Sequence, residues 1–309
     1  MNTALLFSGQ ATQYVGMGRH LYNNYPVCRS VFQHANDVLK EPLSQLIFEG
    51  PESTLNLTAN TQPAVLTVAV AAWMLLRDQG FEPTVVAGHS LGEYGALVAA
   101  GALRFEDALR VCRRRGELMQ AAVAPGQGAM IIVQRLEEET VRSVCREVNG
   151  YADIAVYNAP RLVAVSGEQH AVEAVAAKLE TLRAIVRPLK VSAPFHCDLL
   201  SPAADGLSKV LADIQVSPLK CPYISNVHAE WHTDASPDEI KNRLIRQVVA
   251  PVRWSESISL MIARGIDRFW HLGPGRSNLT HVKKQNRKAN VASFDDAEAV
   301  AQLLEGKLE

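Results

Sequence analysis

The pentapeptide GHSLG at residues 88–92 places a serine in the G-x-S-x-G pattern. The apolar run at 84–88 (TVVAG) is typical of a buried strand, and residues 91–100 predict a helix that stops near Gly101. In such a strand–turn–helix, a strained turn projects the serine hydroxyl from the sheet edge, and small residues two before and two after it avoid a clash. The following helix aims its N–H groups at the same place, so the N–H of Leu91 can stabilise an oxyanion. The pattern predicts that Ser90 is a nucleophile.

A second glycine-flanked turn, SGQATQ at 8–13, follows a strand predicted at 3–8. Parallel strands of one sheet bring the loops at their carboxyl ends together. The N–H of Gln10 can therefore be a second oxyanion donor. A plain β-turn with solvated glutamines is the alternative.

A nucleophilic serine needs a base at neutral pH, and the sequence contains nine histidines. The candidate is His196 in VSAPFHCDLL, because it follows the strand that closes a predicted insert, where a loop returns to the main domain. A solvated histidine is the alternative there. His89 adjoins the serine and should point away from it, and four histidines on polar stretches are expected to be solvated: His20, His34, His170 and His281.

The base has no clear acidic partner in the sequence. Asp198 is too near in the chain to orient the ring of His196, so a backbone carbonyl can hold the imidazole instead. Ordinary α/β-hydrolases have the order Ser…Asp…His with the base near the C-terminus, and this chain departs from that order.

One arginine of the helix predicted at 106–121 points from an apolar stripe. The residues three and four positions from Arg115 are all apolar, whereas those around Arg113 and Arg114 include charged residues. A buried guanidinium is costly without a partner, and its planar fork suits a carboxylate. That carboxylate belongs either to the protein or to a substrate.

The order of the elements indicates an α/β fold with an insertion. The main part has further predicted helices at 62–79, 201–214, 237–248 and 255–264 and a strand at 267–271. Between them, strands at 129–133, 153–158, 162–167 and 184–191 alternate with helices at 136–148 and 169–182. The order βαββαβ is that of a ferredoxin-like unit. We therefore predict a small inserted subdomain at 126–190 and a large subdomain from 1–125 and 191–309.

The overall charge argues against one functional class. The chain has 309 residues and a formal net charge of -1, which argues against a nucleic-acid binder. The dense basic run Lys283, Lys284, Arg287 and Lys288 is either a solvated helix end or a docking patch for an acidic partner.

The five cysteines are scattered and never in CxxC spacing, which favours idle thiols in a reducing compartment over disulfides or a zinc site. The N-terminal residues show no signal peptide, and the longest apolar stretch, Ala64 to Leu76, is too short to span a bilayer. We expect a cytoplasmic protein that does not act on a membrane.

Nine motifs occur in order along essentially the whole chain: FSGQATQ (7–13), TQPAVLT (61–67), GHSLGE (88–93), RRGELMQ (114–120), GQGAM (126–130), YNAPRLVAVSG (157–167), SAPFHC (192–197), RQVVAPVRW (246–254) and LGPG (272–275). Together they resemble the malonyl-CoA:acyl-carrier-protein transacylase family, including the free-standing acyltransferases that serve polyketide synthases. The resemblance implies a hydrolase-like α/β large subdomain with a parallel sheet and an inserted ferredoxin-like small subdomain.

The resemblance also implies roles for individual residues. Ser90 matches the acylated nucleophile and His196 the general base, while Gln10 and Leu91 match the backbone oxyanion donors. Arg115 matches the arginine that binds the free carboxylate of malonyl, and Gln247 the residue whose backbone carbonyl orients the histidine. Gln62 and Asn158 match polar positions of the active-site cleft, and Phe195 and Leu91 resemble the pattern of malonyl-selective enzymes.

The implied activity is that of a malonyl-CoA:[acyl-carrier-protein] S-malonyltransferase with no cofactor and no metal. The implied partners are a CoA thioester and an acyl carrier protein, and free-standing length suggests a monomer. The family usually has GQGSQ where this chain has GQATQ, so the backbone at Ala11 must tolerate a Cβ. Two rivals stay open: an acyl hydrolase that clears carrier proteins, against which Arg115 argues, and a non-catalytic scaffold that only binds them.

Overall fold

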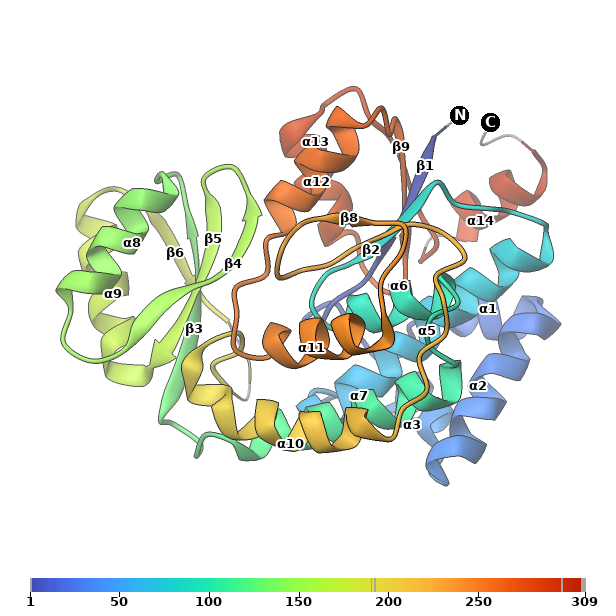
Figure 1. Cartoon of the computed structure of the whole chain (residues 1–309), viewed down its shortest axis with the longest axis horizontal. Helices are drawn as coiled ribbons and strands as arrows, with labels where there is room; N and C mark the ends of the chain where they lie inside the picture. Colours follow the sequence, from blue (N-terminus) through green and yellow to red (C-terminus); the bar gives the residue numbers. More distant parts are fainter. Residues whose placement is uncertain (1, 190, 192, 296, 307–309) are drawn as a thin grey trace.

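The computed structural model describes residues 2–189, 191, 193–295 and 297–306, and it contains two β-sheets (Figure 1). The larger sheet has six strands in the order β10-β9-β1-β2-β7-β8. Their bounds are β1 Thr3–Phe7, β2 Val85–Gly88, β7 Tyr223–Ile224, β8 Trp231–His232, β9 Arg268–Leu272 and β10 Asn290–Ser293. All neighbouring strands are parallel except β7 and β8. The predicted α/β class with a parallel sheet is confirmed.

The smaller sheet has four strands in the order β4-β5-β3-β6, all antiparallel. Its elements are β3 Gly128–Gln134, α8 Glu138–Glu147, β4 Ala152–Ala159, β5 Leu162–Glu168, α9 Gln169–Thr181 and β6 Ile185–Pro188. This is the βαββαβ order expected of a ferredoxin-like unit. These elements also enclose a hydrophobic cluster of their own, which supports our proposal to treat 126–190 as a subdomain.

The last strand of this unit is shorter than predicted. β6 ends at Pro188, although the N–H of the next residue, Leu189, still donates to the Met130 carbonyl of β3 at 2.9 Å. The predicted strand continued to residue 191, and within that extension Lys190 lies outside the described part of the chain. The two ends of the predicted large subdomain, Met1 and 307–309, also lie outside it.

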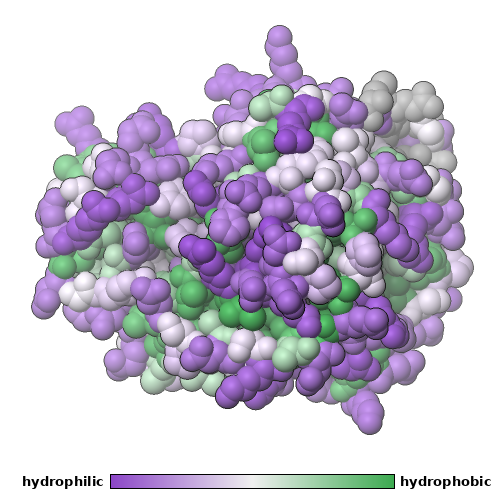
Figure 2. Space-filling model, viewed as in Figure 1, coloured by the Kyte–Doolittle hydropathy of each residue, from purple (hydrophilic) through white to green (hydrophobic). Residues whose placement is uncertain are grey.

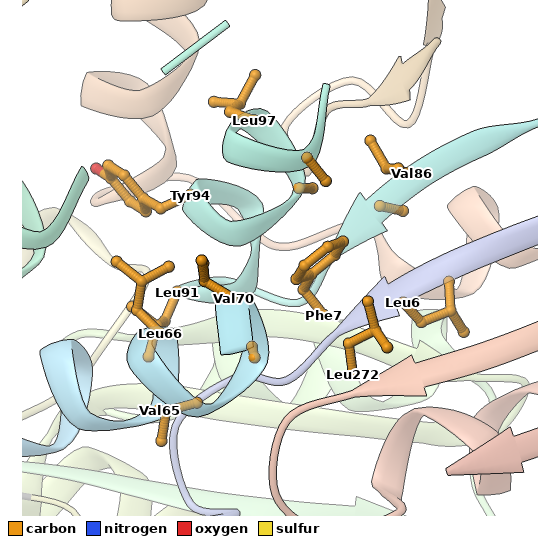
Figure 3. Packing of buried hydrophobic residues seen from close by; sticks show 14 of the residues in the cluster. Leu6, Phe7, Val65, Leu66, Val70, Val86, Leu91, Tyr94, Leu97 and Leu272 are labelled. Atoms are coloured by element: carbon orange, nitrogen blue, oxygen red, sulfur yellow. The ribbon is translucent and has the colours of Figure 1, made fainter. Parts of the chain in front are cut away.

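Helices surround the larger sheet (Figure 1). They are α1 Arg19–Asn24, α2 Pro26–Leu39, α3 Leu43–Glu49, α4 Glu52–Leu55, α5 Thr58–Asp78, α6 Gly92–Ala99, α7 Phe105–Ala121, η1 Asp198–Leu200, α10 Ser201–Ala212, α11 Pro237–Gln247, α12 Trp254–Ala263, α13 Ser277–Gln285 and α14 Ala297–Leu304. In Figure 3, side chains of α5 and α6 surround Phe7 of β1, and these helices bury the residues that precede the candidate site.

Helix α5 begins four residues earlier than the predicted 62–79 and includes Pro63. Proline removes an N–H, so the carbonyl of Ala59 loses its usual helical donor. Arg113 Nη1 donates to this carbonyl at 3.0 Å and replaces that donor. The helix therefore continues through the proline.

Helix α5 is long and apolar enough by composition to span a membrane, although 83% of its most apolar window is buried inside the protein. It packs against α2 and α7, as a core helix does. The face of the molecule drawn in Figure 2 is mainly hydrophilic, with smaller apolar areas between the polar side chains.

Candidate active site

The serine lies at a tight turn between β2 and α6. Ser90 has a φ of 52°, in the left-handed region that a residue with a side chain rarely adopts. A Cβ at Gly88 would lie 1.9 Å from the backbone of Gly92, and a Cβ at Gly92 would lie 2.3 Å from the carbonyl oxygen of Phe7. The two glycines therefore let the strand, the turn and the helix approach closely, as the G-x-S-x-G pattern requires.

The predicted base contacts the serine. His196 Nε2 lies 2.7 Å from Ser90 Oγ, and Nδ1 lies 2.7 Å from the backbone carbonyl oxygen of Gln247. Because a carbonyl only accepts, Nδ1 carries the proton and Nε2 is free to accept from the serine. Asp198 is exposed and is not among the hydrogen-bond partners of the His196 ring, which are Ser90 Oγ and the Gln247 carbonyl.

Burial lowers the pKa of His196 to about 3, with a further lowering by the positive charge of Arg115. The imidazole is therefore neutral at physiological pH and able to accept a proton. Its protonated form is correspondingly unstable in this environment and gives the proton up readily.

The two predicted oxyanion turns are neighbours. Phe7 of β1 is paired with Gly88 of β2, so the turns that follow these residues begin side by side. The backbone N–H groups of Gln10 and Leu91 donate to no other group within the described part of the chain. Ala11 has a φ of 70°, so a residue with a Cβ adopts the left-handed backbone conformation at this position.

The guanidinium of Arg115 is buried beside the serine. Arg115 is 1% exposed and donates from Nη1 to Gln62 Oε1 at 2.9 Å and from Nη2 to Gln247 Oε1 at 2.8 Å. Nη2 also lies 3.4 Å from Ser90 Oγ. Two amide oxygens, and no carboxylate of the described residues, contact this cation, and its buried Nε has no hydrogen-bond partner. The guanidinium therefore keeps one donor, Nε–H, that no described residue uses.

Most of the predicted residues line one cavity of about 220 Å³: Gln10, Gln62, Ser90, Arg115, Asn158, Phe195 and His196. Leu91 and Gln247 are buried and are not among the lining residues, and the backbone carbonyl of Gln247 contacts His196. The rest of the wall is largely apolar, with Met119, Met130 and Ile132 among its residues. The cavity therefore combines one reactive serine, one cation and an apolar lining.

Asn158 reaches the cavity from β4 of the smaller sheet. Its Oδ1 lies 3.0 Å from Nε2 of His89, which lines the same cavity. Strand β4 is joined to the larger part of the chain by the hydrogen bond from Tyr157 N–H to the Val252 carbonyl, 2.9 Å long. The cavity is thus built from both sheets.

The prediction that His281 is solvated is wrong. Its helix, α13, packs against β4 and β9, so that His281 lines the cavity with an Nδ1 that is buried and unpartnered. Burial lowers its pKa to about 3, with smaller contributions from His89, Lys284 and His271. The three other histidines in that group, His20, His34 and His170, are exposed.

Sequence reasoning missed two buried polar residues beneath the serine. Asn226 Oδ1 accepts from the N–H of Ser90 at 2.7 Å, and Glu93 Oε2 accepts from Gln247 Nε2 at 2.6 Å. Glu93 stands out in the sequence, since it is the only charged residue in the apolar helix that follows the elbow. Asn226 lies in a loop after the two-residue strand β7 and has no periodic signal.

Among the described residues, no three histidine, cysteine, aspartate or glutamate side chains are placed to hold a metal ion. The five cysteines are all free thiols, and burial raises the pKa of the Cys197 thiol beside the base.

Comparison with known proteins assigns the family. Residues 4–302 match the family model of the acyl transferase domain. The malonyl CoA-acyl carrier protein transacylase of Bacillus subtilis is 41% identical over 302 residues, which cover 96% of this chain and 94% of that protein. The enzyme of the same name from Escherichia coli K12 is 37% identical over 306 residues, with 98% of each chain covered. The chain belongs to the malonyl-CoA:acyl-carrier-protein transacylase family.

Solved structures of this family have the same fold. The malonyl CoA-acyl carrier protein transacylase of Coxiella burnetii superposes with a TM-score of 0.96 at 35% identity, over 100% of this chain and 98% of that one. A malonyl-transacylase solved in complex with a type II PKS acyl-carrier protein, AntF, superposes with a TM-score of 0.95 at 36% identity, over 99% and 100% of the two chains.

Proposed function

We propose that the protein transfers malonyl from malonyl-CoA to the phosphopantetheine thiol of an acyl carrier protein through a malonyl-Ser90 intermediate, in fatty acid or polyketide biosynthesis. One observation carries the proposal. In a single cavity, Ser90 Oγ lies 2.7 Å from the Nε2 of His196 and 3.4 Å from the Nη2 of Arg115. A nucleophile with a base on one side and a cation on the other suits an acyl group that ends in a carboxylate.

In the first half of the reaction, Ser90 Oγ transfers its proton to His196 Nε2 and attacks the carbonyl carbon of the malonyl thioester. The N–H groups of Gln10 and Leu91 hold the negative charge that forms on the carbonyl oxygen. The carbon–sulfur bond then breaks, the CoA thiolate takes the proton from His196, and malonyl remains as an ester on Ser90.

In the second half, His196 takes the proton of the pantetheine thiol, whose sulfur attacks the ester carbon. The bond to Ser90 Oγ breaks, and Oγ recovers the proton from His196. The backbone carbonyl of Gln247 keeps the Nδ1 proton in place throughout. Every proton in this cycle moves between the substrates and these two side chains, so the scheme uses no metal or cofactor.

Arg115 provides selectivity in this scheme. A malonyl carboxylate beside Nη2 can also occupy the unpartnered Nε, and a side-on pair of hydrogen bonds is the geometry that carboxylates favour. Gln62 and Gln247 hold the guanidinium by accepting from Nη1 and Nη2. The apolar wall, including Phe195, leaves little room or polarity for a second charged group.

The proposed partners follow from the same cavity. The thiol acceptor is a carrier protein, and the exposed basic run at Lys283, Lys284, Arg287 and Lys288 continues from α13, the helix that contributes His281 to the cavity wall. An acidic carrier protein docked on this run would bring its arm to the cavity. We also propose that the protein is a cytoplasmic monomer, and its free thiols fit a reducing compartment.

Mass spectrometry of the intact protein after exposure to malonyl-CoA tests the proposal. We expect one malonyl adduct on the wild-type protein and none on Ser90→Ala. Ser277→Ala, which removes another serine of the same cavity, should keep the adduct. Holo carrier protein should then discharge the adduct and gain the malonyl group.

An adduct that survives in Ser90→Ala would contradict the mechanism. Discharge to free malonate faster than to the carrier protein would favour the hydrolase. Binding of carrier protein without any adduct would favour the scaffold.

A further inference from the structure

The carboxylate of Glu93 lies in the interior next to the reactive serine, and the mechanism above does not use it. Glu93 is in the first turn of α6 and is 1% exposed. Its Oε2 accepts hydrogen bonds from Gln247 Nε2 at 2.6 Å and from the backbone N–H of Asn226 at 3.3 Å. Burying a carboxylate is costly, and here its hydrogen bonds and the nearby charge of Arg115 offset part of that cost.

Gln247 connects the base to the cation. Its backbone carbonyl accepts from Nδ1 of His196 at 2.7 Å, and its side-chain Oε1 accepts from Nη2 of Arg115 at 2.8 Å. Its Nε2 donates to Glu93 and also to the backbone carbonyl of Ser90 at 3.0 Å. One fully buried residue therefore touches the nucleophile's backbone, the base and the arginine.

The orientation of the Gln247 amide matters because its two ends have opposite character. With Oε1 toward Arg115 and Nε2 toward Glu93, every contact pairs a donor with an acceptor. A flipped amide would aim N–H groups at the guanidinium and an oxygen at the carboxylate. Burial raises the pKa of Glu93 to about 7, and above that pH its ionised carboxylate only accepts, so Glu93 then selects the first orientation.

Asn226 adds a second connection from Glu93 to the elbow. Its Oδ1 accepts from the N–H of Ser90 at 2.7 Å, and its Nδ2 donates to the carbonyl of Gly88 at 2.6 Å. Glu93 accepts from the backbone of this residue and so fixes its distance from the turn. The strained φ of Ser90 is thereby held from beneath.

From these contacts we infer that Glu93 is a positioning residue. Its carboxylate fixes the orientation of the Gln247 amide and the position of the Asn226 backbone, and through them the positions of Arg115 and His196 relative to Ser90. The inference rests on the proposed function for its malonyl readout. It does not assign Glu93 any contact with substrate.

The test compares Glu93→Leu with Glu93→Gln in the full-length protein, with thermal unfolding as the control for folding. Both partners of Oε2 are donors, so glutamine can present an oxygen to them and leucine cannot. Two rates are measured at pH 7.5: acylation of Ser90 by malonyl-CoA against acetyl-CoA, and inactivation by phenylmethanesulfonyl fluoride. The rate of inactivation reports on Ser90 and His196 alone, because the sulfonyl fluoride carries no carboxylate.

We expect Glu93→Leu to lower the malonyl-to-acetyl ratio by about 10- to 100-fold, the equivalent of one hydrogen bond to a charged group. It should also slow the sulfonyl fluoride reaction. Glu93→Gln should recover most of both losses. A folded Glu93→Leu with the wild-type ratio and reactivity, or a Glu93→Gln as defective as leucine, would overturn the inference.

If Glu93→Leu does not fold, Gln247→Met decides the question, since it removes the amide and keeps the backbone carbonyl. It should lower the malonyl-to-acetyl ratio to the same extent, and an unchanged ratio would refute the inference. A wild-type protein that reacts with the sulfonyl fluoride and not with malonyl-CoA would refute the proposed function instead. The sulfonyl fluoride rates would then still decide the role of Glu93.

Discussion

Replacing Arg115 by alanine should separate malonyl transfer from acetyl transfer. Arg115 is buried, and its Nη2 lies 3.4 Å from the nucleophile. In the variant, the carboxylate of malonyl would enter the same cavity with no cation to meet it. Leaving one member of a buried ion pair alone costs about 3–5 kcal/mol, which corresponds to roughly two to four decades in kcat/KM. Acetyl has no carboxylate, so its transfer should fall by less than about tenfold on the same reasoning.

The neighbouring arginine supplies the control. Arg114 is exposed and forms a 2.8 Å ion pair with Glu117 on the same helix, so Arg114→Ala should change stability by no more than about 0.5 kcal/mol and leave both activities intact. Arg115→Lys keeps the charge and loses the planar fork, so its malonyl activity should lie between those of wild type and alanine. The assay is kcat/KM for both thioesters with a saturating carrier protein.

A second signature distinguishes loss of the cation from general damage. Arg115 is one of the causes that lower the pKa of His196, so its removal should raise that pKa. The base acts in its neutral form, and activity is lost as pH falls through the pKa. The acid limb of acetyl transfer should therefore move to higher pH in Arg115→Ala. An unchanged malonyl-to-acetyl ratio in a folded variant would refute the assignment of Arg115 to the substrate carboxylate.

Two further predictions concern stability. His196, His271 and His281 have pKa values lowered by burial to about 3, 4 and 3, so the folded state keeps them neutral while the unfolded chain protonates below about pH 6.5. Stability should fall as pH drops below 6.5, and His281→Leu should lessen the loss at pH 5 by roughly 2 kcal/mol in urea unfolding, whereas the exposed His170→Leu should not. Ala11→Gly should raise stability by about 0.5–1 kcal/mol, because it relieves a left-handed residue whose exposed methyl group packs little; an unchanged urea midpoint would contradict this.

The sequence predicts the elements that have a long apolar periodicity or a turn signal at their ends. The strands and helices of the inserted unit lie within a few residues of their predicted positions, since each has an apolar periodicity and a turn signal. β7 and β8 have two residues each, too few for any periodicity. The predicted start of α5 is four residues too late. Pro63 leaves one helical carbonyl without its usual donor, and the replacement donor, Arg113, belongs to a different helix, which the local sequence does not reveal.

The site residues divide in a similar way. Local patterns predict Ser90 and Arg115: a pentapeptide for one, and helical spacing on an apolar stripe for the other. The same spacing argument does not place Glu93 in the interior, because two of the residues three and four positions away, His89 and Ser90, are polar. His281 shows the limit of that argument, because its polar neighbours on α13 hide the fact that this face of the helix covers the cavity. Only the packing of α13 against β4 brings it there.

A backbone carbonyl as the partner of His196 suits the negative charge of the proposed substrate. An aspartate at that position would place a second negative charge within the cavity that receives the malonyl carboxylate. It would also compete for Arg115, which has no carboxylate among its contacts in the described chain. A carbonyl fixes the imidazole tautomer equally well and carries no formal charge. Glu93 accepts from Gln247 on the other side of that residue, where its charge supports the network, and Arg115 keeps its free donor for the substrate.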